Sequence, residues 1–158
     1  MRSAYNLARW LVRNGQDAED IVQEAFLKAF KALDQYRGGD ARIWTLTIVR
    51  NTAMNFLRKR KTDNGVDLEQ LQAADRSANP EQELLEENRR EQVRRAIARL
   101  EPEFRETLVL REIEGLSYKE IAAVLNIPAG TVMSRLARAR QRLLIELAPV
   151  KEVRHELP

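Results

Sequence analysis

Apolar residues recur every three or four positions through most of this 158-residue chain, which is the spacing of helices that bury one face. The first such segment is capped by Asp17 and ends before Tyr36, and its inward positions are Ile21, Ala25, Phe26, Ala29 and Leu33. A second helix is predicted from about Ile43 to Arg60, with Ile43, Leu46, Ile48, Ala53 and Leu57 mostly inward. Since no segment requires a strand, the pattern predicts an all-α fold.

The helical spacing fades between residues 62 and 80, where Asp, Asn, Gln and Ala dominate and Asn79-Pro80 closes the segment. We interpret this stretch as a linker. A long helix is predicted from Glu81 until Glu101 and Pro102 end it, followed by shorter helices over 104–113 and 117–126. The last of these begins with Ser117 and Glu120 at the spacing of a capping box. The predicted organisation is a domain at 1–61, a linker at 62–80 and a domain at 81–158.

The region from Ser117 to Leu143 has the pattern of a helix-turn-helix with its turn at 126–129. The second helix of the motif carries four arginines and no acidic residue between 129 and 143. A helix of this kind can present its N-terminal half to a DNA groove and its arginines to phosphates and bases. The alternative is a solvated arginine-rich helix that pairs with the acidic run from Glu81 to Glu91.

Composition excludes several classes of function. The chain has 27 basic and 24 acidic side chains, no cysteine, and one histidine, His155. Thiolate zinc sites and cysteine nucleophiles are therefore excluded. The histidine and cysteine side chains that a catalytic triad or a transition-metal site needs are almost absent. Neither a P-loop nor a dinucleotide fingerprint occurs, and no apolar stretch approaches a membrane span. We expect a cytoplasmic protein that is not an enzyme, with no catalytic residue, cofactor, metal or membrane insertion.

A second basic patch lies between Arg42 and Lys61, with six positive charges and no negative one. Trp44, Asn51 and Asn55 are interleaved with these charges. Cations suit phosphates, whereas aromatic rings and amides suit unstacked bases, so the patch favours single-stranded DNA. The alternative is that the aromatic residues belong to the core and the cations end a helix.

Three blocks of this sequence resemble extracytoplasmic-function (ECF) sigma factors of bacterial RNA polymerase, members of the sigma-70 family. The blocks are DAEDIVQEAFLKAF, YRGGDARIWTLTIVRNTAMNFLRKRK and LREIEGLSYKEIAAVLNIPAGTVMSRLARAR, and they cover most of the chain. The resemblance implies two small helical domains, sigma2-like and helix-turn-helix sigma4-like, on either side of the linker. The first would bind polymerase and open the minus-10 element, and the second would read the minus-35 element as duplex. It also implies that most of the family's first helix is missing ahead of AYNLARWLV.

The resemblance further implies three sets of site residues. Polymerase would be bound by Asp20, Gln23 and Glu24. The minus-10 element would be contacted by Trp44, Arg50, Asn51, Asn55, Arg58 and Lys59. The minus-35 element would be contacted by Arg111, Thr131, Met133, Ser134, Arg135, Ala137 and Arg138. Within these sets, Asn51 would hold a flipped base and Arg138 is best placed for a guanine edge or a phosphate. Met133 stands where a basic residue is frequent, which predicts a shifted sequence preference.

The partners implied are promoter DNA, an anti-sigma factor and core RNA polymerase, through a coiled coil of its largest subunit and the flap of its second-largest subunit. Two other hypotheses remain open. One is a one-component regulator that binds duplex DNA without polymerase. The other is a recombinase fragment, which would need a serine or acidic catalytic cluster before the linker, where Ser3 is the only serine.

Overall fold

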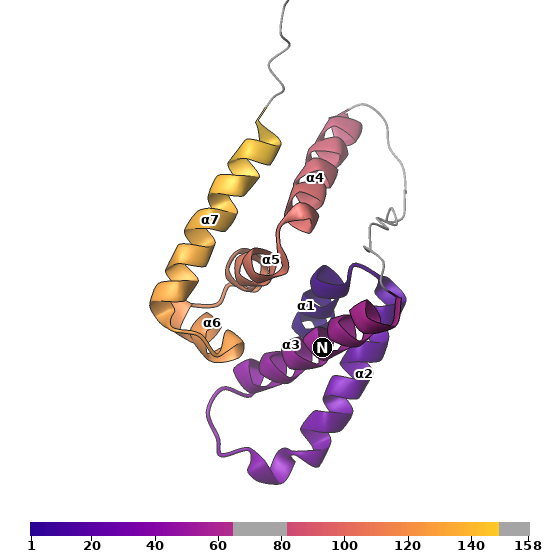
Figure 1. Ribbon diagram of the computed structural model, residues 1–158, viewed down its shortest axis with the longest axis vertical. Coiled ribbons are helices and arrows are strands. Elements are labelled where there is room, and N and C mark those ends of the chain that lie inside the picture. Colours follow the sequence, from indigo (N-terminus) through magenta and orange to yellow (C-terminus); the bar gives the residue numbers. More distant parts are fainter. Residues whose placement is uncertain (65–81, 149–158) are drawn as a thin grey trace, which may run out of the picture.

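The structure, a computed structural model, describes residues 1–64 and 82–148. The helices form two groups (Figure 1). The first contains α1 (Arg2–Val12), α2 (Gly15–Lys31), the 3₁₀ turn η1 (Leu33–Gln35) and α3 (Ala41–Asn64). The second contains α4 (Gln82–Arg99), α5 (Pro102–Leu108), the π-helical turn η2 (Val109–Ile113), α6 (Tyr118–Leu125) and α7 (Ala129–Leu147). No strand occurs in these two ranges, and the prediction of an all-α chain is confirmed.

The first domain packs α1, α2 and α3 against one another. Most of the predicted inward positions are buried or half-buried, with Ile21, Ala25 and Leu46 among the most deeply buried. Leu33 was predicted to face inward, but it is 52% exposed, so this prediction is wrong. The α-helix ends at Lys31 and tightens into η1, so the α-helical spacing no longer holds at this residue.

The start of α2 also differs from the prediction. Asn14, not Asp17, is the capping residue, because its Oδ1 accepts a hydrogen bond from the Asp17 backbone N–H at 3.0 Å. Asp17 lies in the first turn instead, and its carboxylate accepts a 2.6 Å bond from Arg60 of α3. The acidic residue therefore faces the positive end of the helix dipole and ties α2 to α3.

The second domain contains the predicted helix-turn-helix. Ser117 caps α6 in a complete capping box with Glu120, and Asn126 ends α6 in the left-handed conformation at φ 53°. The turn then leads into α7, where Val132, Leu136 and Ala139 form a buried stripe. The structure thus contains the two helices and the turn that the sequence predicted, and the prediction of the motif is confirmed.

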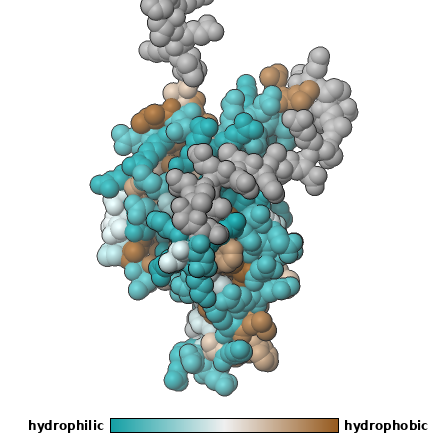
Figure 2. Space-filling view, turned by 45° about the vertical axis from the view of Figure 1, so that its right-hand side comes forward, coloured by the Kyte–Doolittle hydropathy of each residue, from teal (hydrophilic) through white to brown (hydrophobic). Residues whose placement is uncertain are grey.

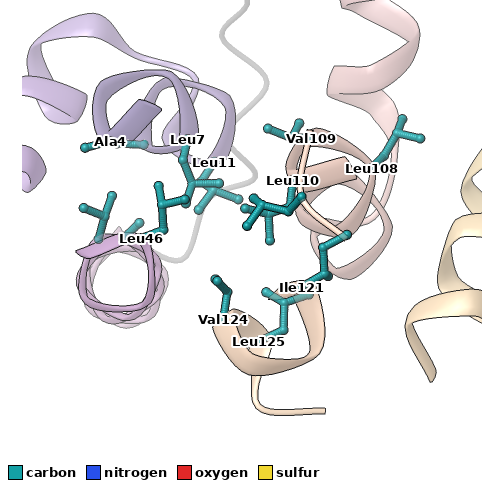
Figure 3. Close-up of a cluster of buried hydrophobic side chains, with 14 of the residues drawn as sticks. Ala4, Leu7, Leu11, Leu46, Leu108, Val109, Leu110, Ile121, Val124 and Leu125 are labelled. Atoms are coloured by element: carbon teal, nitrogen blue, oxygen red, sulfur yellow. The ribbon is translucent and has the colours of Figure 1, made fainter. Parts of the chain in front are cut away.

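The two domains also pack directly against each other, α3 against α6 and α1 against α5. In Figure 3, Leu7, Leu11 and Leu46 from the first domain face Leu110 and Val124 from the second. The sequence predicted two domains but not this shared core. α3 continues to Asn64, so residues 62–64 of the predicted linker are helical. The rest of the predicted linker lies outside the described residues.

Two kinds of feature do not occur in residues 1–64 and 82–148. No helix there is long and apolar enough to cross a membrane. No group of three or more histidine, cysteine or acidic side chains that could hold a metal ion occurs there either.

Candidate nucleic-acid and polymerase interfaces

The outward face of α7 is polar and open. Ser134, Ala137 and Arg138 are exposed, Met133 is 54% exposed and Thr131 is partly exposed. The Ser134 hydroxyl donates to the Thr131 carbonyl at 3.0 Å, which leaves its oxygen free to accept. Arg138 forms no ion pair within the described part of the chain. A guanidinium, a hydroxyl and a thioether therefore share one solvent-facing surface.

The three other arginines of α7 pair with glutamates of their own domain. Arg140 lies 2.8 Å from Glu112, and Arg142 pairs with Glu101. Arg135 lies 3.7 Å from Glu106. Hydrogen bonds to Glu112 and then Tyr118 raise the pKa of Arg140 above its ordinary value. These pairs leave Arg138 as the arginine of α7 best placed to reach DNA.

The acidic run was the alternative partner for these arginines, and the described residues do not support that interpretation. Glu91 pairs within α4, at 3.1 Å from Arg95, and Glu86 lies 3.9 Å from Arg90. Glu86 and Glu91 thus pair with arginines on their own helix, as acidic and basic residues four positions apart commonly do.

Arg111 was predicted to contact the minus-35 element and is engaged inside its own domain. Its Nη1 donates to the Leu116 carbonyl at 2.8 Å, and its guanidinium lies 4.9 Å from the centre of the Tyr118 ring. The side chain therefore holds the turn that leads into α6. A DNA contact from Arg111 would use only the remaining donors of its guanidinium.

In α3, four of the six predicted minus-10 residues are exposed: Asn51, Asn55, Arg58 and Lys59. Trp44 is half-buried, with its ring centroid 5.1 Å from that of Tyr36. This contact fixes the indole and leaves part of it open to solvent. Trp44 can therefore belong to the core and still offer a ring face on which a base could stack.

Arg50 differs from the other residues of its set. It donates from Nε and Nη2 to both carboxylate oxygens of Glu106, at 2.9 and 3.0 Å. Glu106 belongs to α5 in the second domain, and its side chain is 2% exposed. The structure thus brings together two predicted DNA contacts, Arg50 and Arg135, around one buried carboxylate.

The exposed face of α2 carries Asp20, Gln23 and Glu24, all open to solvent, with Glu24 paired to Lys28 at 2.7 Å. The same face continues with Leu27 and Phe30, which are 62% and 74% exposed. Figure 2 shows hydrophobic surface at the lower tip of the molecule, where α2 and η1 end in Figure 1. Neither residue was among those predicted from the sequence to form a site. Their signal was available, because they fall three positions apart on the polar side of an amphipathic helix.

A second apolar surface lies in the other domain. A groove between α4, η2 and α7 is lined mainly by Val93, Ile97, Leu108, Val109, Ile113 and Leu143. Glu112 and Arg140 form its polar edge. The groove is therefore an apolar surface with a charged edge.

Family comparisons match both domains. Residues 1–62 match the family model of Sigma-70 region 2, and residues 90–143 match that of Sigma-70, region 4. The ECF RNA polymerase sigma-E factor of Escherichia coli (strain K12) is 40% identical over 144 residues, covering 85% of this chain and 75% of that protein. The RNA polymerase sigma-H factor of Pseudomonas aeruginosa is 38% identical over 149 residues, covering 88% and 77%.

Solved structures are similar to the whole fold. The sigma factor RpoE from Bartonella quintana, in complex with the anti-sigma factor NepR, superposes with a TM-score of 0.77 at 27% identity. That match covers 95% of this chain and 92% of RpoE. CnrH, in complex with the cytosolic domain of CnrY, gives a TM-score of 0.64 at 27% identity, over 90% and 79% of the two chains.

Proposed function

The chain belongs to the ECF sigma factors of the sigma-70 family, which direct RNA polymerase to promoters, and we propose how its exposed surfaces divide this task. The observation that carries the proposal is the exposure of two separate DNA-compatible faces, one in each matched region. Asn51 and Arg58 lie on the face in α3, and Ser134 and Arg138 lie on the face in α7. The protein acts as a non-enzymatic specificity subunit in the cytoplasm.

The first domain binds the minus-10 element as single strand. Arg58 and Lys59 attract the phosphates, while Asn51 and Asn55 offer amide donors and acceptors to a base. Extruding a base from the duplex costs a few kcal/mol, which contacts to the flipped base must offset. The exposed end of α3 supplies both kinds of contact within about two helical turns.

The second domain reads the minus-35 element as duplex. The capped α6 supports α7 from behind, so that residues 131–138 can enter a major groove. Arg138 suits the O6 and N7 acceptors of guanine, and Met133 offers apolar contact where a cation would have bound a phosphate. The engaged Arg111 acts mainly by holding α6 in position.

Two further surfaces bind protein partners. Asp20, Gln23 and Glu24, extended by Leu27 and Phe30, dock on the coiled coil of the largest polymerase subunit. The mixture of charge and exposed apolar side chains fits a specific interface, where aromatic anchors provide affinity and charges provide selectivity. The apolar groove between α4 and α7 takes the flap of the second-largest subunit. An anti-sigma factor competes for such surfaces. In support, the similar sigma factor RpoE is found in complex with the anti-sigma factor NepR.

The decisive experiment combines the purified chain with bacterial core polymerase and maps transcript starts on genomic DNA. We expect core binding and starts at a limited set of promoters. Asp20→Lys should weaken core binding by about tenfold, because it places a cation where an anion is required. Glu87→Lys, which makes the same charge change on the exposed surface of α4, is the matched control.

Other outcomes of this experiment contradict the proposal. A wild-type chain that binds no core polymerase would overturn it. High duplex affinity without core binding would support the one-component regulator instead. Equal losses from Asp20→Lys and Glu87→Lys would remove the assignment of the α2 face and leave the location of the core-binding surface to be found elsewhere on the chain.

A further inference from the structure

The exposed face of α2 changes in character along the helix. Its first half is acidic, with Asp20 and Glu24, its middle carries Leu27, and its last turn carries Lys28 and Lys31. All five residues are exposed, and Leu27 lies on the side of the helix opposite to the buried alanines of α2. The face therefore runs from negative to positive, with an apolar centre.

This face is open to a partner. α2 packs on α1 and α3, and together with η1 it reaches the lower end of the molecule in Figure 1. Neither Asp20 nor Lys31 forms an ion pair within the described residues. Leu27 is 62% exposed and Phe30 is 74% exposed. Apolar side chains that protrude to this extent beside charged ones are typical of a surface that another protein covers.

The order of charges on this face is complementary to its own reverse. A two-fold symmetric interface brings the same patch of two subunits together, so the patch must match itself when it is turned around. When two copies of α2 lie antiparallel, the acidic half of each helix lies along the basic half of the other. A uniformly charged surface matches only one half of such a face, whereas a reversed copy of α2 matches both halves at once.

The spacing of the charged residues selects one register of the antiparallel pair. With the two-fold axis close to Phe26, Asp20 of one copy lies level with Lys31 of the second copy, to within about one residue's rise. Glu24 lies level with Lys28 of the second copy in the same register. Symmetry repeats each contact, so the register places four pairs of opposite charges across the interface.

The exposed apolar side chains fall at the centre of the same register. Leu27 is one residue from the axis, so the Leu27 side chains of the two copies meet, and Phe30 lies about one turn away beside them. One helix face is smaller than the interface of roughly 1,200 Å² that holds a stable complex. We therefore expect a weak dimer with a Kd of about 10 to 100 µM.

We propose that the free protein forms an antiparallel homodimer through the exposed faces of two α2 helices. Asp20 faces Lys31 across the interface, and Leu27 faces Leu27. Because this surface is also the one assigned above to core polymerase, pairing and core binding exclude each other, a consequence that rests on the proposed function. A high concentration of free chain thus holds the protein in a dimer that does not bind core polymerase.

Sedimentation equilibrium of the isolated chain from about 1 to 300 µM measures the pairing. The wild-type chain should change from monomer to dimer across this range. Leu27→Glu should weaken pairing by about tenfold or more, because it places two carboxylates at the axis. Leu85→Glu, the same change at a 63% exposed leucine of α4, should leave pairing unchanged. A wild-type chain that stays monomeric, or equal effects of the two substitutions, would overturn the proposal.

An exchange of charges tests the antiparallel register. Asp20→Lys and Lys31→Glu should each weaken self-association by about tenfold, since each places like charges opposite one another twice. A mixture of the two variants should pair as tightly as the wild type, because both contacts in the mixed dimer again join opposite charges. Glu87→Lys and Lys119→Glu make the same changes on exposed surfaces of α4 and α6 and are the controls. The absence of recovery in the mixture would overturn the proposed pairing.

Competition with core polymerase has a separate readout. The chain has no native cysteine, so Gln141→Cys places a donor or an acceptor label at an exposed site of α7. Energy transfer between labelled copies reports pairing, and an equimolar amount of core polymerase should abolish it. Transfer that persists in chains bound to core would overturn the competition. If the chain binds no core polymerase while the charge exchange restores pairing, the proposed function fails and the dimer stands.

Discussion

Ion pairing distinguishes Arg138 from the other arginines of α7, although all four look equivalent in the sequence. The four arginines of α7 have similar neighbours along the chain, but three of them reach glutamates on α5, η2 or the turn before α5. The partners in these ion pairs lie 28 or more residues apart in the sequence, so tertiary packing decides which carboxylate each arginine reaches. The local spacing of residues does not reveal it. The same holds for Arg50, whose partner lies 56 residues away.

Arg138→Ala should weaken binding to the matching minus-35 duplex by about 1 to 3 kcal/mol and relax discrimination at one base pair. The reason is that a guanidinium bound to a guanine edge is lost, and alanine offers no donor. Competition binding against duplexes with single-base changes measures both effects. Arg140→Ala is the control, because Arg140 is held by Glu112. An unchanged base preference in Arg138→Ala would contradict its assigned role.

Asn51→Ala should impair opening of a duplex promoter more than use of a pre-melted one. The exposed amide is expected to stabilise a base that has left the stack, which matters only where the duplex must first be opened. Open-complex formation by the holoenzyme on paired templates, one duplex and one with a mismatched bubble at the minus-10 element, measures the difference. Equal losses on both templates would remove the base-capture role.

At the level of helices, the sequence predicted well wherever the signal is local. The capping box at Ser117 and the buried stripe of α7 both appear where the pattern placed them. The misses have local geometric causes. Asn14, and not Asp17, caps α2. The turns η1 and η2 are 3₁₀ and π-helical, and a hydrophobic pattern with a period of 3.6 residues does not reveal such turns.

The exposed face of α2 shows that a departure from the amphipathic pattern can itself be informative. Leu27 and Phe30 project from the polar side of the helix, next to three residues predicted to bind polymerase. A core position would have buried them, and a purely solvated face would have carried polar residues. Exposed apolar side chains beside charged ones are typical of a docking surface.

Phe30→Ala should weaken binding to core polymerase by about tenfold or more and leave thermal stability almost unchanged. An aromatic anchor contributes strongly when a partner covers it, whereas a side chain that is 74% exposed adds little to folding. Titration of core polymerase with labelled protein and a thermal melt measure the two quantities. Leu85→Ala, which truncates a 63% exposed side chain in α4, should change neither. Core affinity equal to wild type in Phe30→Ala would exclude this residue from the interface.

For the whole molecule, the sequence indicated two domains and their order but not their contact. The residues at the interface, such as Leu46, Leu110 and Val124, look like ordinary core positions of their own helices. Hydrophobic spacing tells that a residue is buried and does not tell which helix covers it. The closed arrangement is therefore information that only the folded structure supplies.

The two proposed DNA surfaces belong to one chain, so initiation should depend on the distance between the two promoter elements. DNA is stiff over this length, and adding about five base pairs turns one element by about half a helical turn relative to the other. We expect promoter use by the holoenzyme to fall by about tenfold or more, because the second contact loses the benefit of being tethered to the first. Transcription from templates with the native and the lengthened spacer measures this fall. Binding of the isolated chain to a minus-35 duplex alone is the control and should not change, since it involves one surface. Equal transcription from both templates would mean that the α3 and α7 surfaces do not engage the same promoter together.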